Sequence, residues 1–91
     1  MDGQVIDGKR YRNLREQAGL HRTELAGLIG CSAGHLKNVE IGVVGSAFAA
    51  RNQLSAVLSH RSARVFTQRL GYPVSVSDFT VAAAAANGAA A

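Results

Sequence analysis

The feature that most constrains this chain is the spacing of small and aliphatic residues between positions 22 and 41. Two short helices joined by a three-residue turn can pack at a steep angle only under two conditions. The first helix needs a very small residue at the crossing, and the turn needs a residue that tolerates left-handed backbone. Ala26 and Gly30 occupy these two positions. The inward apolar positions of the same template are Leu25, Ile29, Cys31, Leu36 and Val39. The pattern therefore predicts helices over residues 22–29 and 33–40, the second capped by Ser32.

Helical periodicity and capping residues also recur on both sides of this segment. We expect a helix over residues 9–18, capped by Asp7 and stopped at Gly19, after a loose leader at residues 1–6. A further helix runs from a Ser55 cap to about Leu70 and stops at Gly71.

The remaining segments are expected to be irregular or helical. Residues 47–51 are predicted to form a short helical turn, and the Tyr72–Pro73 pair favours extended backbone over residues 74–76. A last helix is expected to start at Ser77–Asp78 and to continue through Phe79 and Val81 into the alanine run. Alternation with period two is not found over a useful length. The prediction is an all-α, compact bundle of about five helices, formed by residues 7–81 and followed by an alanine-rich tail or helix extension at residues 82–91.

Composition narrows the class of partner. A chain of 91 residues is expected to form one domain, and its ten Lys and Arg against six Asp and Glu favour a polyanionic partner. Lys9, Arg10, Arg12 and Arg15 crowd into one short stretch. The single cysteine, Cys31, excludes an internal disulfide and is typical of a reducing cytoplasm. Neither a signal pattern nor an apolar stretch long enough for a bilayer is present. We therefore expect a cytoplasmic protein, acting in the bacterial cytoplasm or nucleoid.

Two segments of the chain resemble a known family. Residues 18–42, AGLHRTELAGLIGCSAGHLKNVEIG, are similar to the Cro/C1-type (xenobiotic-response-element type) helix-turn-helix domain. Residues 55–79, SAVLSHRSARVFTQRLGYPVSVSDF, resemble its fourth helix, the Leu-Gly stop and the lead into the fifth. Glu40 followed by Gly42 matches the acidic-x-glycine close of its third helix. The resemblance implies a five-helix bundle that binds double-stranded DNA, usually as a dimer. The chain departs from the family where His21 and Arg22 replace the usual Ser or Thr and Gln.

The helix predicted over residues 33–40 is expected to enter the major groove of DNA, because a helix of this size fits there. Its outward residues are Ala33, Gly34, Lys37 and Asn38, with His35 and Ile41 at the margins. Asn38 is the best base-reading candidate, since an amide bonds adenine at two points, and Lys37 reaches a guanine or a phosphate. Ala33 would touch a thymine methyl group, and Gly34 would let the backbone come close. The alternative is that Lys37 and Asn38 are ordinary solvated residues.

Other positions suit phosphate groups. Arg22 and Ser32 stand at helix starts, where free backbone N–H groups and the positive end of the helix dipole attract anions, and His35 lies in the same first turn as Ser32. The resemblance adds Arg51, Asn52 and Gln53, because the loop before the family's fourth helix often meets the DNA backbone.

Together these observations predict a sequence-specific DNA-binding transcriptional regulator, such as a small repressor of Cro type. We expect a homodimer, with Phe79, Val81 and the alanine run, or Val43–Val44, as dimer surfaces. Catalytic residues, a metal site, a cofactor and a small-molecule ligand are not expected. Two alternatives stay open: an accessory DNA-binding protein that bends DNA, such as a recombination directionality factor, and an antitoxin-like protein-interaction module.

Overall fold

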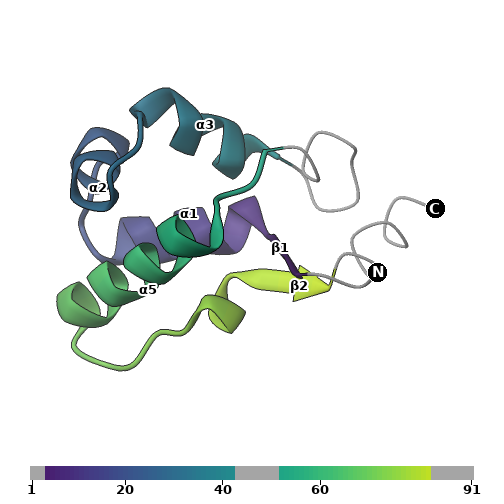
Figure 1. Ribbon diagram of the computed structural model, residues 1–91. Helices are drawn as coiled ribbons and strands as arrows, with labels where there is room; N and C mark the ends of the chain where they lie inside the picture. The colour runs from purple at the N-terminus through teal and green to yellow at the C-terminus, as the bar shows by residue number, and fades with distance from the viewer. Residues whose placement is uncertain (1–3, 43–51, 83–91) are drawn as a thin grey trace.

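Four α-helices make up most of the residues that the computed structural model describes, which are residues 4–42 and 52–82. The helices are α1 (Gly8–Gln17), α2 (Arg22–Ile29), α3 (Ala33–Ile41) and α5 (Ala56–Leu70). A two-stranded sheet, β1 (Gln4–Ile6) with β2 (Thr80–Ala82), and the short 3-10 helix η1 (Val76–Asp78) complete the described part. In Figure 1, α1 and α5 lie in the middle of the molecule, with α2 and α3 on one side and η1 and β2 on the other. The described fold is therefore mostly helical, and the all-α prediction with about five helices is wrong in this respect.

The predicted boundaries of α1, α2, α3 and α5 are confirmed to within a residue, and local hydrogen bonds account for them. The Asp7 carboxylate accepts the backbone N–H of Lys9 at 3.1 Å, and the Ser55 hydroxyl accepts that of Leu58 at 3.2 Å. Each side chain thereby satisfies an amide that has no partner within its own helix. The predicted stops at Gly19 and Gly71 both have left-handed backbone, with φ of 71° and 79°. Local sequence is enough to start and stop these helices.

The sheet joins two segments that were not expected to be strands. Residues 4–6 were predicted to be a loose leader and residues 80–82 part of a helix, yet they pair antiparallel with Val5 opposite Val81. The backbone N–H of Asp7 extends this contact by donating to the carbonyl of Phe79 at 2.9 Å. Both strands are rich in β-branched residues, which favour extended backbone. Each strand is only three residues long, too short for a period-two pattern to reveal it.

The extended segment expected after Pro73 is shorter than predicted. The hydroxyl of Thr67 donates to the carbonyl of Val74 at 3.1 Å and accepts its N–H at 2.9 Å, which fixes the chain against α5. The next residue, Ser75, donates its N–H to the carboxylate of Asp78 at 2.8 Å. Because this contact closes the turn of η1, extended backbone ends before Val76.

The core is centred on three aromatic rings, Tyr11, Phe66 and Phe79. Each pair packs edge to face, with ring centroids 5.3 to 5.9 Å apart, and all three residues are fully buried. The Tyr11 hydroxyl lies 2.7 Å from that of Ser62, and burial raises the pKa of Tyr11. Phe79 is 0% exposed, so its prediction as a dimer surface is wrong. Directly after Phe79, residues 80–82 run beside β1 instead of continuing the predicted helix.

Several predictions lie outside the described residues. They concern the helical turn at residues 47–51, the Val43–Val44 dimer surface, Arg51, and the alanine run beyond Ala82.

Candidate nucleic-acid interface

The turn between α2 and α3 has the geometry that the sequence predicts. Gly30 adopts left-handed backbone, with φ of 90° and ψ of 40°. The N–H groups of Gly30 and Cys31 both donate to the carbonyl of Ala26, at 2.8 and 3.0 Å, so the chain reverses within three residues. Ala26 itself is only 2% exposed. In Figure 1 α2 is seen nearly end-on while α3 runs across the view, so the two helices are steeply inclined.

One side of α3 is buried and the other is open. Leu36 and Val39 belong to the core, as predicted, and so do Leu25 and Ile29 of α2. Exposed residues of α3 are Gly34, Lys37, Asn38 and Ile41, whereas Ala33 and His35 are half-buried. Ala33 packs against the edge of the core, so less of it is available to a partner than predicted. The other residues predicted to read bases, Gly34, Lys37 and Asn38, share the exposed side.

The carboxylate of Glu40 lies on the buried side of α3 and is bound by two arginines. Arg15 approaches it with two nitrogens, Nε 2.7 Å from Oε2 and Nη2 2.9 Å from Oε1, and Arg22 donates through Nε at 3.0 Å. The Glu40 side chain is 0% exposed. The hydrogen bond to Glu40 raises the pKa of Arg15 further, so this guanidinium stays charged. Two cations therefore surround one anion inside the fold.

Sequence reasoning missed this cluster. The basic stretch gave no indication that Arg15 is buried while Lys9, Arg10 and Arg12 are exposed. Its neighbours are held separately: Arg12 pairs with Glu16 at 3.1 Å and Arg10 with Asp7 at 3.4 Å. The signal that was available is the spacing of four residues between Tyr11 and Arg15, which places both on one face of a helix.

A close approach of α1 to α3 fixes the position of the latter helix. Gly8 is buried at the start of α1, and a Cβ added there would lie 2.4 Å from the carbonyl oxygen of Val39 and 2.6 Å from that of Glu40. Only a residue without a side chain allows the two backbones to come this near. The last turn of α3 therefore rests directly on α1.

At the helix starts, some of the groups that were predicted to bind phosphate already have partners within the protein. Arg22 is bound to Glu40, with its side chain 33% exposed. At the start of α2 the backbone N–H of His21 donates to the carboxylate of Glu24 at 3.0 Å, so this amide is not open to an anion. Ser32 is exposed and accepts the N–H of His35 at 3.0 Å, which confirms its predicted role as a cap.

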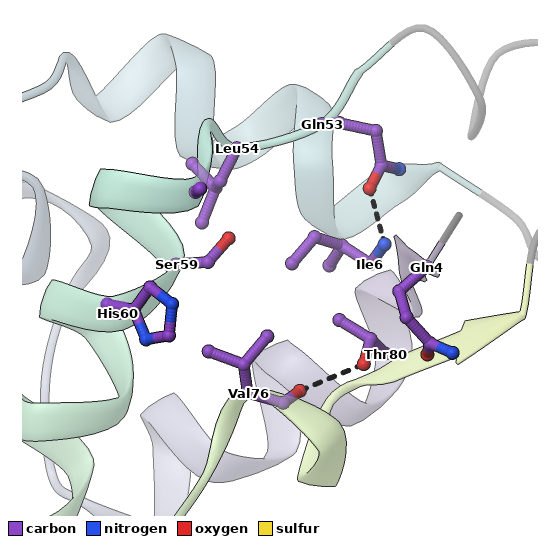
Figure 2. Close-up of a pocket in the computed structure, with 9 residues that line it drawn as sticks. Gln4, Ile6, Gln53, Leu54, Ser59, His60, Val76 and Thr80 are labelled. Atoms are coloured by element: carbon purple, nitrogen blue, oxygen red, sulfur yellow. Dashed lines mark hydrogen bonds between the residues drawn. The ribbon is translucent and has the colours of Figure 1, made fainter.

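Two of the residues before α5 that were predicted to contact phosphate lie within the described part of the chain, and both are half-buried. Asn52 and Gln53 are both of intermediate exposure. The side-chain oxygen of Gln53 accepts the backbone N–H of Ile6, as Figure 2 shows, and so ties β1 to the segment before α5. Gln53 therefore has a structural contact that the sequence did not reveal.

Comparison of the chain with protein-family models, curated proteins and solved structures finds no match. Among the described helices, none is sufficiently long and apolar to span a membrane.

Proposed function

We propose that this chain is a sequence-specific regulator that binds double-stranded DNA and places the exposed side of α3 in the major groove. One observation carries the proposal: α3 keeps an open side while its single carboxylate, Glu40, is turned inward and bound by Arg15 and Arg22. The open side presents Lys37 and Asn38 without an acidic residue of α3 to repel phosphates. The turn at Gly30 supports the same proposal, because it lets α3 pack on α2 through one side and leaves the other side open.

The roles within the interface follow from the chemistry of the exposed side chains. The Asn38 amide donates and accepts together, which matches the adenine edge in the major groove. Lys37 carries a flexible positive charge that suits a phosphate or a guanine. Gly34 adds no side chain, so the backbone of the first turn of α3 can approach the bases closely. We expect so small a DNA-binding domain to bind a pseudo-palindromic site as a homodimer.

Selection of bound duplexes from a random pool tests the proposal directly. We expect the protein to enrich a symmetric motif, and we expect Asn38→Ala to lose the preference at one position of each half-site while non-specific binding persists. A lost bidentate contact reduces discrimination by about 1–3 kcal/mol. Thr23→Ala, which removes an exposed polar group on α2, is the control and keeps the motif. A pool without an enriched motif for the unaltered protein would refute sequence-specific binding.

The positive charge of Lys37 on α3 leads to a separate prediction about how the affinity for DNA depends on salt concentration. Lys37→Ala is expected to weaken binding to all sequences alike and to reduce the slope of log K against log salt by about one. Arg69→Ala removes the same charge from the end of α5, which lies far from α3 in Figure 1, and is expected to leave the slope unchanged. Equal slopes for Lys37→Ala and the unaltered protein would place Lys37 outside the interface.

A protein-interaction module is the second candidate function. The observation that favours it is the exposure of Ile41, whose surface is 50% accessible at the end of the same open side. This reading predicts a protein partner bound tightly at high salt, together with weak DNA binding that salt abolishes. Titrations of DNA and of the partner at two salt concentrations therefore separate the two functions.

A further inference from the structure

A cavity lies on the side of the molecule where the sheet meets α5, separate from the exposed side of α3. Its walls come from β1, the segment before α5, the first turns of α5, η1 and β2, as Figure 2 shows. Its volume is about 250 Å³. Drug-sized ligands occupy cavities of roughly 300–1,000 Å³, so this space suits a small molecule rather than a nucleotide or a peptide.

A hydroxyl group from a largely buried residue lines the cavity. Ser59 is only 6% exposed, and Figure 2 shows its oxygen directed into the cavity. Within residues 4–42 and 52–82 this hydroxyl has no hydrogen-bond partner, unlike that of Ser62, which lies one turn further along α5 and donates to the carbonyl of Leu58 at 2.8 Å. No fully buried side-chain oxygen of the described residues lacks a partner, so the Ser59 oxygen is accessible from the cavity and can form a hydrogen bond with a ligand there.

The other lining residues define the chemistry of the ligand. Ile6, Leu54 and Val76 provide aliphatic walls, while the ring of His60 lies beside Ser59. Asp, Glu, Lys and Arg are absent from the described lining, so an ionic group would lose its hydration without gaining a counter-charge. An uncharged head group has a smaller desolvation cost and still bonds to a hydroxyl.

We propose that this cavity binds a small uncharged molecule with an aliphatic body and one hydrogen-bonding head, such as an amide or an alcohol, held by the Ser59 hydroxyl. This site was not expected from the sequence, which suggested no small-molecule ligand. It does not depend on DNA binding by α3.

The test is a titration of the full chain with hexanamide, followed by two-dimensional amide NMR. We expect shifts for residues of β1, the first turns of α5 and β2, and weaker effects from hexanoate and hexylammonium, which share the same chain but carry a charge. Ser59→Ala is expected to reduce the affinity for hexanamide about five- to tenfold, the effect of one lost hydrogen bond. Thr23→Ala, an exposed hydroxyl on α2, is the matched control and leaves the affinity unchanged.

A second variant tests the cavity itself. Ala56→Leu adds bulk at an exposed lining position in the first turn of α5 and is expected to abolish binding while the NMR spectrum remains that of a folded protein. The proposal is overturned if hexanamide shifts no cavity resonance, or if Ser59→Ala or Ala56→Leu binds it as well as the unaltered chain does. Tighter binding of hexanoate or hexylammonium overturns the assignment of an uncharged ligand.

Discussion

Gly8→Ala is expected to lower the free energy of unfolding by about 3 kcal/mol. The added methyl group would lie 2.4 Å from the carbonyl oxygen of Val39 and 2.9 Å from the carbonyl carbon of Glu40. Both are backbone atoms, so a change of side-chain rotamer relieves nothing. Either α1 moves away from α3 or the last turn of α3 unwinds. Urea unfolding followed by circular dichroism measures the loss.

Gly27→Ala is the matched control for this substitution. Gly27 is exposed within α2, and a Cβ added there meets no atom within 4 Å. Because alanine favours helix over glycine by roughly 1 kcal/mol, this variant is expected to be more stable than the unaltered chain. Opposite signs for two identical substitutions would show that close packing of α1 on α3, rather than helix propensity, decides the outcome at Gly8. A Gly8→Ala variant as stable as the unaltered chain would contradict that packing.

Glu40→Ala is expected to destabilise the fold by about 3–5 kcal/mol. The substitution removes the partner of two guanidinium groups and leaves Arg15, whose side chain is 9% exposed, as an uncompensated buried charge. The remaining contact of Arg15, a hydrogen bond of 2.8 Å from Nη1 to the carbonyl of Leu20, does not replace the lost anion. We expect α3 to lose its fixed orientation on α1, and with it any specific binding through its open side. Chemical denaturation and hydrogen exchange of the α3 amides measure these effects.

An exposed ion pair provides the control. Glu16 and Arg12 pair at 3.1 Å on the surface of α1, and both side chains are at least half exposed. Glu16→Ala is expected to cost less than about 1 kcal/mol, since solvent screens such pairs. If Glu16→Ala and Glu40→Ala lowered the free energy of unfolding by similar amounts, the buried cluster would contribute no more to stability than a surface ion pair.

The sequence alone determined the parts of this protein that depend on near neighbours. Asp7, Ser32 and Ser55 cap their helices through amides two or three residues away, and the left-handed turn at Gly30 needs no distant partner. In each case the interacting groups lie within a few residues of each other along the chain. The helix pair α2–α3 and its open side, on which the proposed function depends, were therefore predictable from residues 22–41.

Tertiary structure decided what distant segments do to each other. Strands β1 and β2 lie more than seventy positions apart, and each is too short for a recognisable alternation of residues. Their pairing forms only when the two ends of the described chain come together. The partnership of Arg15 with Glu40 and the cavity beside Ser59 likewise arise only when elements pack. A local pattern records the periodicity of one element. It does not show which other element will pack over a given side chain and bury it. In this protein, both the ion cluster of Arg15, Arg22 and Glu40 and the sheet form through such packing.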